Sequence, residues 1–258
     1  MTASDRVRYR IDLAFHGAQF HGWQRQPGLR TVQGELEMWL SRLLPDHDPV
    51  TLTGAGRTDA GVHAEHMVAH FDSHSIIDPA QLTLRLQAAL PDDISVLGLV
   101  PVTGDFHARF SAVARTYVYR ICTCPNPFGR DRAWRIPPAF SLEIAQDAAS
   151  RILGGHDFSG FCLAASQRES MTCLVRESRW EQIEDGYAYQ VTANRFLHGM
   201  VRLLVGTMAD ISRGRWPAQR MEEILERKDV RLCGMAAPPH GLTLVQIEYP
   251  DSVVPRPD

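Results

Sequence analysis

The sequence is poor in lysine and contains no long hydrophobic run. Lys228 is the only lysine among the 27 basic residues of this 258-residue chain, so arginine carries almost all of the positive charge. No stretch approaches the roughly 20 apolar residues of a membrane-spanning helix, and the polar start of the chain lacks the apolar core of a signal peptide. These absences predict a cytoplasmic protein without a membrane segment.

Cysteine is scarce and scattered. The chain has 5 cysteines, an odd number without regular spacing, which argues against a disulfide framework. Cys122 and Cys124 are too close together for a common zinc motif, and no second close pair completes one. We therefore expect reduced and mostly buried thiols.

The charge balance gives no direct sign of a nucleic-acid partner. The formal net charge is −3. The arginine fork suits phosphate and stacks on bases, although a codon bias explains the excess of arginine equally well. Because the local field near a site matters more than the sum of charges, the composition permits RNA binding without predicting it.

Strand and helix patterns alternate along the whole chain. Apolar and polar residues alternate over 7–15, as in a half-buried strand, and a helix is expected from an N-cap at Thr31 to about Leu44. Asp78 and Pro79 are typical of the start of a second helix. Further helices are expected at 141–153, 195–212 and 216–227, and strands at 50–53, 67–71, 94–102, 112–122, 174–183, 187–193 and 241–249.

Hairpin-length connections between several of these strands argue against a strictly parallel sheet. The pattern predicts an α/β protein of the α+β type, with mixed or antiparallel sheets flanked by helices. Prolines cluster at 125–127 and 137–138, where few regular elements fit. We therefore predict two α/β halves, residues 1–125 and 126–258.

A glycine-rich run over residues 53–63 is the first candidate for chemistry. It places Arg57 and Asp59 among three glycines, which allow close approach of the backbone to a ligand. The Walker lysine and the G-x-G-x-x-G pattern are both absent, so this is not a phosphate loop of a known type. An ionised aspartate here suits a nucleophile or a general base, whereas composition alone favours a tight surface turn.

Two other segments combine arginine with apolar or aromatic residues. On the strand expected at 112–122, Arg115, Tyr117 and Tyr119 share one face, which suits base stacking as well as a packed core. On the helix expected from residue 195, His198 and Arg202 are four residues apart beside an apolar stripe. Arg202 therefore either extends to the surface or pairs with a buried anion.

A metal site is the main rival interpretation. His63, His66 and His70 have helical spacing and follow Asp59 closely. The sequence around them favours a strand, which places His63 opposite the other two.

Taken together, these segments resemble the tRNA pseudouridine synthase A family over nearly the whole chain. The matching stretches are Gly22-Trp23-Gln24-Arg25-Gln26-Pro27, Thr31-Val32-Gln33-Gly34, Gly56-Arg57-Thr58-Asp59-Ala60-Gly61-Val62-His63-Ala64, Leu90-Pro91-Asp92-Asp93-Ile94, Phe106-His107-Ala108-Arg109-Phe110, Arg115-Thr116-Tyr117-Val118-Tyr119, His156-Asp157-Phe158, Met200-Val201-Arg202, Val205-Gly206-Thr207 and Ala237-Pro238-Pro239-His240-Gly241-Leu242.

The resemblance implies conversion of uridine to pseudouridine at positions 38, 39 and 40 of the tRNA anticodon stem-loop. It implies a homodimer that needs no metal or organic cofactor. It also implies two α/β halves with the RNA-binding active-site cleft between them, the second half completing the cleft and carrying dimer contacts.

Residue by residue, the resemblance implies roles for five side chains. Asp59 matches the catalytic aspartate, Tyr117 the tyrosine that stacks on the target base, and Arg202 the arginine that pairs with the aspartate. Arg57 matches an arginine that lines the site, and Leu242 an apolar residue against the uracil. Three roles stay open for the aspartate: attack on the sugar, attack on the base, or removal of the C2′ proton.

Arg115, on the strand face of Tyr117, is expected to contact the substrate as well. Two positions depart from the family pattern. Cys162 stands where many relatives have an arginine that contacts RNA, and Arg168 is a candidate to make that contact instead. Cys233 lies in a segment whose residues differ from those common in the family, which indicates altered packing. Two other functions remain as alternatives, namely a metal-dependent hydrolase and a non-catalytic RNA-binding protein.

Overall fold

The computed structural model describes residues 6–45, 48–137, 139–163 and 170–251. The chain divides into two compact units, one formed by residues 1–113 with 244–258 and the other by residues 114–243. The predicted division into residues 1–125 and 126–258 remains a prediction about domains. None of the described helices has the length and hydropathy that a membrane span requires.

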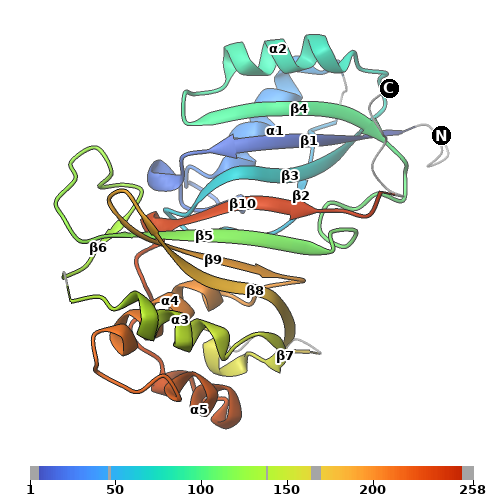
Figure 1. The fold of residues 1–258 in the computed structure, drawn as a ribbon. Coiled ribbons are helices and arrows are strands. Elements are labelled where there is room, and N and C mark those ends of the chain that lie inside the picture. Colours follow the sequence, from blue (N-terminus) through green and yellow to red (C-terminus); the bar gives the residue numbers. More distant parts are fainter. Residues whose placement is uncertain (1–5, 46–47, 138, 164–169, 252–258) are drawn as a thin grey trace. The chain divides into compact units, whose positions relative to one another are not determined.

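The first unit is a sheet with two helices on one face (Figure 1). Its strands follow the order β4-β1-β3-β10, and β2 pairs with β3. Helix α2 packs against both β4 and α1. The elements of this unit are β1 (Val7–Phe15), α1 (Val32–Leu43), β2 (Thr53–Gly54), β3 (His63–Ser73), α2 (Pro79–Ala89), β4 (Ile94–Val102) and most of β10 (Leu242–Glu248).

The two faces of β1 differ as its alternating sequence predicts. Ile11 and Leu13 are fully buried in the core of the unit. On the other face, Arg8 donates two hydrogen bonds to Asp72 of β3, at 2.7 and 2.8 Å. Arg8 and Asp72 are also direct partners in the antiparallel pairing of β1 with β3. This bidentate ion pair therefore fixes the register that the apolar face requires.

Both helix starts that the sequence predicts in this unit are confirmed. Thr31 accepts a hydrogen bond from the backbone N–H of Gly34 at 3.3 Å, and Asp78 accepts one from Ala80 at 3.0 Å. Pro79 occupies the first turn of α2, where its missing N–H costs nothing.

The second unit is a sheet in the order β5-β9-β8-β7, with the short β6 beside β5. β6 runs parallel to β5, whereas the β5–β9, β8–β9 and β7–β8 pairs are antiparallel. The described strands and helices thus confirm the predicted α+β class with mixed sheets. The elements of this unit are β5 (Ala114–Cys122), β6 (Trp134–Arg135), α3 (Leu142–Ser150), β7 (Gly154–Asp157), β8 (Thr172–Ile183), β9 (Gly186–Ala193), α4 (Met200–Ser212), α5 (Arg220–Arg227) and the 3₁₀ turns η2 (Ser159–Phe161), η3 (Val230–Leu232) and η4 (Pro239–Gly241).

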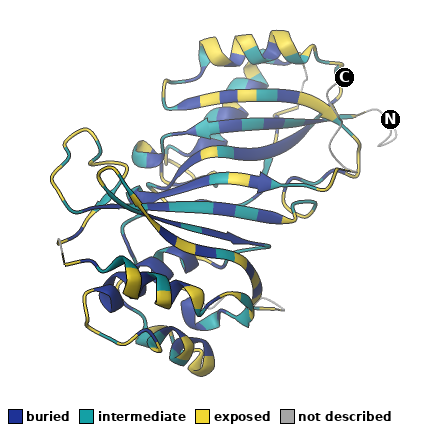
Figure 2. Cartoon of the chain, in the orientation of Figure 1, coloured by how far each residue is buried: buried dark blue, intermediate teal, exposed yellow. Residues whose placement is uncertain are grey.

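Helices α3 and α4 cover one face of this sheet, and burial alternates along β8 (Figure 2). Trp180 of β8 is held from that face, because its backbone N–H donates to Gln146 of α3 at 2.7 Å and its indole N–H approaches the sulfur of Met208 in α4 at 3.4 Å. The apolar side of β8 is thus packed against both helices.

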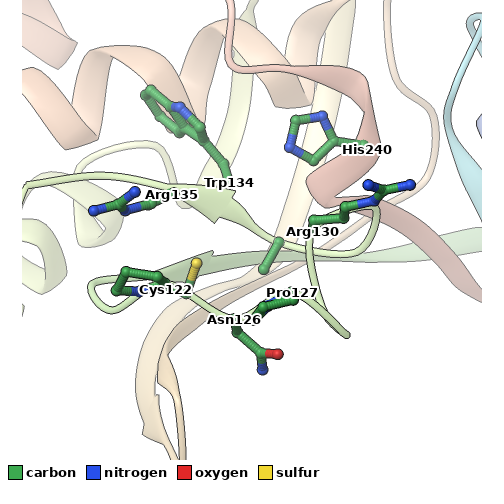
Figure 3. Close-up of a pocket in the computed structure, with 9 residues that line it drawn as sticks. Cys122, Asn126, Pro127, Arg130, Trp134, Arg135 and His240 are labelled. Atoms are coloured by element: carbon green, nitrogen blue, oxygen red, sulfur yellow. The ribbon is translucent and has the colours of Figure 1, made fainter.

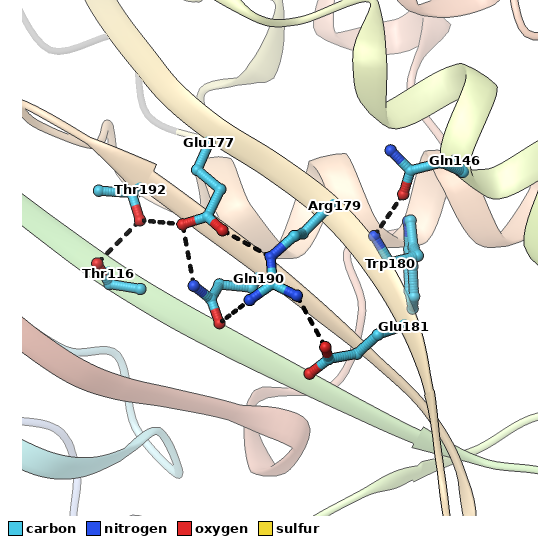
Figure 4. Close-up of polar contacts among 8 residues, drawn as sticks. All are labelled: Thr116, Gln146, Glu177, Arg179, Trp180, Glu181, Gln190 and Thr192. Carbon is cyan, nitrogen blue, oxygen red and sulfur yellow. Dashed lines mark hydrogen bonds and ion pairs between the residues drawn. The ribbon is translucent and has the colours of Figure 1, made fainter.

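The opposite face carries a polar network across three strands (Figure 4). Glu177 accepts hydrogen bonds from Arg179 at 2.6 Å, Gln190 at 2.9 Å and Thr192 at 3.2 Å. Thr192 is also bonded to Thr116 of β5 at 2.9 Å. Burial raises the pKa of Glu177, but these donors outweigh that effect and leave its pKa below the usual range. The carboxylate therefore ties β8, β9 and β5 together while it stays ionised.

One helix begins later than its sequence predicts. α4 starts at Met200, not at residue 195, because Gly199 adopts a left-handed conformation with φ of 69°. His198 consequently lies outside the helix, and the predicted i, i+4 pairing with Arg202 on one helix is wrong. Helix α5 likewise begins at Arg220, after the turn that follows Trp216.

Candidate active site

Asp59 lies in a turn that follows β2 in the first unit. Ala55, which extends β2, donates a backbone hydrogen bond to Val68 of β3 at 2.8 Å. The turn then closes where Val62 donates to the carbonyl of Asp59 at 3.2 Å, beside Gly61 with φ of 81°. The carboxylate is therefore held between a strand pairing and a hydrogen-bonded turn, and its side chain is half-buried.

A second loop, residues 16–23, fixes the backbone of this turn. The N–H of Trp23 donates to the carbonyl of Thr58 at 3.1 Å, and Gly61 donates to Phe20 at 3.2 Å. Gly22, with φ of 87°, lies so close that a Cβ there would be 2.6 Å from the carbonyl oxygen of Thr58. Only glycine fits this approach, so the two loops form one rigid support for Asp59.

Arg57 is the exposed residue of this turn. Its neighbour Thr58 is only 6% exposed. The exposure of Arg57 leaves its side chain accessible to a charged substrate. This arrangement suits the predicted role of Arg57 at the rim of a site and does not test it.

In the second unit, β5 carries Arg115 and Tyr117 on the same strand face. The guanidinium of Arg115 donates to the carbonyl of Asn194 at 2.8 Å. The ring of Tyr117 meets Phe196 edge to face, with 5.1 Å between centroids and 88° between planes. Tyr117 is half-buried, so Phe196 orients its ring without covering it.

Phe196 is the site residue that sequence reasoning missed. Its periodicity with Met200 and Leu203 suggests a helical core position, but it precedes α4 and faces the ring of Tyr117 instead. The signal in the sequence that could have separated Phe196 from the helix is Gly199. Glycine is favoured where the backbone is left-handed, and Gly199 takes that conformation just before α4.

Arg202 is fixed at the start of α4 by a reciprocal pair of hydrogen bonds. Its Nε donates to the carbonyl of Ala237 at 2.7 Å, and the N–H of Ala237 donates to the carbonyl of Arg202 at 2.9 Å. One more turn along α4, a Cβ on Gly206 would overlap the carbonyl of Met235. The segment around 235–237 therefore packs directly on the helix backbone and sets the position of the guanidinium.

The same segment leads to Leu242. The hydroxyl of Tyr119 donates to the carbonyl of Pro238 at 2.8 Å, and a Cβ on Gly241 would lie 2.6 Å from the Tyr119 ring. Leu242 is 6% exposed at the start of β10. In this unit, one continuous set of contacts thus links Arg202, the 237–242 segment and β5, while Asp59 and Arg57 belong to the first unit.

The three histidines that suggested a metal site lie on a strand and have separate partners. His63 accepts a hydrogen bond from the N–H of Gly17 at 3.0 Å, and His70 accepts one from Ala108 at 3.1 Å. His66 faces Asp12 at 3.7 Å. Among the residues that the structure describes, no group of three or more histidine, cysteine, aspartate or glutamate side chains is placed to hold a metal ion.

His70 is expected to destabilise the protein in acid. Burial, together with the nearby Arg8 guanidinium, lowers its pKa from 6.5 to about 4. The unfolded state therefore binds the proton first, and stability that is fully present above pH 6.5 is lost as the pH falls toward 4. Between neutral pH and pH 4.5 we expect this residue to cost about 1–2 kcal/mol of unfolding free energy.

Urea unfolding of wild type and His70→Asn over this pH range checks the expectation. The asparagine oxygen still accepts from Ala108 but does not titrate, so the variant should lose less stability in acid. Parallel pH profiles of the two proteins would contradict the role of His70.

The two departures from the family pattern fall in the second unit. Cys162 is buried at the end of η2, and the thiol of Cys233 lies 3.2 Å from the carbonyl of Gly160. Burial raises the pKa of Cys233 to about 12, so its thiol stays protonated. Both cysteines therefore serve packing here. Arg168, the candidate replacement for the missing arginine, lies outside the described residues.

Comparison with known proteins agrees with these motifs over nearly the entire chain. A family model described as tRNA pseudouridine synthase matches residues 148–250. A tRNA pseudouridine synthase A of Parabacteroides distasonis is 38% identical over 252 residues, which cover 97% of this chain and 99% of the relative. One of Cereibacter sphaeroides is 40% identical, with 94% and 96% covered, and one of Bacillus subtilis is 36% identical, with 94% and 99% covered. Similarity of this degree over full-length relatives shows that the chain belongs to the tRNA pseudouridine synthase A family.

Proposed function

We propose that this enzyme isomerises uridine to pseudouridine at positions 38, 39 and 40 of the tRNA anticodon stem-loop, with Asp59 as its catalytic carboxylate. Membership in the family makes it an isomerase that forms pseudouridine in tRNA. The observation that carries the assignment of Asp59 is its rigid, glycine-lined support, which presents a half-buried carboxylate on a fixed backbone. A carboxylate held in this way needs little reorganisation when charge develops in the transition state.

The reaction moves one bond and needs no redox partner. The bond from C1′ to N1 of uracil breaks, the ring turns, and C5 bonds to C1′. C5 then loses its proton and N1 takes one up, so that the product is an isomer of the substrate. Asp59 acts in its ionised form, either as a nucleophile toward sugar or base or as the base that removes the C2′ proton. A neighbouring positive charge favours this ionised form, and we assign that charge to Arg202.

Arg202 suits this assignment because its backbone and Nε are both bonded to Ala237. Because Nε is already held by Ala237, the guanidinium group has little freedom left, and less entropy is lost when its other nitrogens bind a carboxylate. Its pairing with Asp59 is implied by the family resemblance.

Tyr117 is assigned to hold the detached uracil. Extrusion of the target base from the stem-loop stack costs a few kcal/mol, and stacking on an exposed aromatic face offsets part of that cost. Phe196 orients the ring at 88° to its own plane, and the half-buried ring keeps part of its surface for the base. Leu242 provides an apolar contact against the uracil, and Arg57 and Arg115 bind the flanking RNA.

The family resemblance further supports a cytoplasmic homodimer that uses no metal or organic cofactor. The alternatives receive no comparable support. The histidines of the metal-dependent hydrolase are directed to Gly17, Asp12 and Ala108. A non-catalytic RNA-binding protein has no need for the rigid support beneath Asp59.

The wild-type reaction tests the proposal directly. The enzyme is incubated with tRNA tritiated at uracil C5, in the presence of a chelator, and released tritium is measured. We expect one tritium per uridine at positions 38, 39 and 40, and none from a tRNA with cytidine at all three positions. Release that requires metal, or the absence of release from the uridine-containing tRNA, would refute the proposal.

A further inference from the structure

A basic pocket that Tyr117 does not line lies in the second unit (Figure 3). It has a volume of about 410 Å³ and is enclosed by the 125–135 segment, the end of β5 and the η4 turn. In Figure 3, Arg130 and His240 lie toward one side and Arg135 toward the other, with Trp134 between them. Among the described residues that line this pocket, none is acidic.

A preformed turn beside the pocket exposes an aromatic ring. The side-chain oxygen of Asn126 accepts hydrogen bonds from the N–H groups of Phe128 at 3.0 Å and Gly129 at 3.1 Å. The amide nitrogen of Asn126 donates to Asp185 at 2.9 Å and anchors the turn to the β8–β9 hairpin. Phe128 at its tip is 100% exposed. A fully exposed phenyl ring on an anchored turn presents its faces to solvent, where a base can stack on it.

The arginines at the pocket are accessible to a ligand. Arg130 contacts only its neighbour Asp131, at 3.5 Å, and both side chains are largely exposed. Arg135 also lines the pocket and is exposed. These guanidinium groups bind phosphate at little cost, because the exposed Arg130–Asp131 pair is weak and is readily exchanged for a phosphate.

The pocket adjoins the segments that we assign to the target uridine. Trp134 meets Tyr119 edge to face at 6.4 Å, and Tyr119 shares its strand face with Tyr117. His240 of the pocket precedes Leu242 by two residues. From Tyr117 to the pocket residue Cys122, β5 extends about 17 Å, which corresponds to roughly five base steps of a stacked strand.

We propose that this pocket binds a second nucleotide of the tRNA, several steps from the target uridine. Its base stacks on Phe128, and the phosphates on its two sides are held by Arg130 and Arg135. The combination of an exposed ring with accessible guanidinium groups is typical of single-stranded RNA sites, where stacking tolerates any base. This inference rests on the proposed function, because it takes tRNA as the partner.

Affinity for tRNA, measured by fluorescence anisotropy at several salt concentrations, tests the inference. We expect Phe128→Ala to weaken binding by about 5- to 20-fold, and Phe128→Trp to bind at least as tightly as wild type. Arg130→Ala with Arg135→Ala should weaken binding by about 10-fold or more and lower the slope of log Kd against log salt by about 0.7 per lost phosphate contact. Phe128 and both arginines are exposed, so these changes leave folding intact, which melting temperatures verify.

Arg132→Ala is the matched control, since Arg132 is an exposed arginine of the same segment that does not line the pocket. Affinities of the pocket variants that equal that of Arg132→Ala would overturn the inference. Tritium release at saturating tRNA separates the two proposals. The pocket variants should retain the wild-type kcat for tritium release. If the wild-type enzyme itself releases no tritium, the proposed function is refuted, even where the pocket variants lose affinity for tRNA.

Discussion

Asp59→Asn is expected to abolish tritium release from C5-labelled tRNA, with kcat lowered by at least about 1,000-fold. The amide has the size and shape of the carboxylate but neither its charge nor its basicity. It therefore removes nucleophilic and general-base function alike, whichever the enzyme uses. The surrounding backbone should not move, because the carbonyls of Thr58 and Asp59 are held by Trp23 and Val62.

The variant should bind tRNA with nearly the wild-type Kd and melt at a similar temperature. Asp92→Asn is the control, because Asp92 is an exposed carboxylate of the same unit. It should leave kcat unchanged. Turnover by Asp59→Asn at a rate near that of Asp92→Asn would remove Asp59 from the chemistry.

Tyr117→Phe should lower kcat by about 100-fold and leave the Kd for tRNA almost unchanged. Phenylalanine keeps the ring, its contact with Phe196 and the stacking face, so the base is still held. Only the hydroxyl is lost, and we expect that hydroxyl to assist removal of the C5 proton after the ring has turned. Single-turnover tritium release, combined with tRNA affinity, separates the two effects.

Tyr119→Phe provides the contrast. The Tyr119 hydroxyl is committed to the carbonyl of Pro238 at 2.8 Å, and burial raises its pKa far above the usual value. Its removal should cost about 1 kcal/mol of stability and leave kcat intact. If Tyr117→Phe turns over like wild type, the hydroxyl has no role in catalysis. If it loses tRNA affinity instead, the hydroxyl serves binding.

Local signals made much of the fold predictable. The caps at Thr31 and Asp78 are sequence-local interactions, and they start α1 and α2 as predicted. The hairpin at 184–186 and the strand predicted at 67–71 also follow from neighbouring residues, although the strand extends further, over 63–73. The late start of α4 was not predictable from periodicity, because the apolar stripe continues through Phe196 into a segment that is not helical.

The support of the site depends on contacts between residues that are distant in sequence. The fit of Gly22 against the Thr58 carbonyl joins two separate loops, and the bonds between Arg202 and Ala237 join a helix to a turn 35 residues later. Neither contact can be predicted from the composition of the chain or from the spacing of its residues. The residues alone left open whether Asp59 is a catalytic carboxylate or part of a surface turn. The family resemblance implied its catalytic role.

The division of the chain into units has a consequence for its biosynthesis. The second unit is inserted between residue 113 and residue 244 of the first, and β10, which pairs with β3, follows that insertion. A ribosome needs on the order of ten seconds to synthesise the inserted unit, at about 5–20 residues per second. During that time the part of the β3 edge that β10 covers has no partner strand, so the inserted unit is complete before the one that precedes it. During synthesis the inserted second unit is therefore completed first. The first unit is completed only when β10 emerges and pairs with β3.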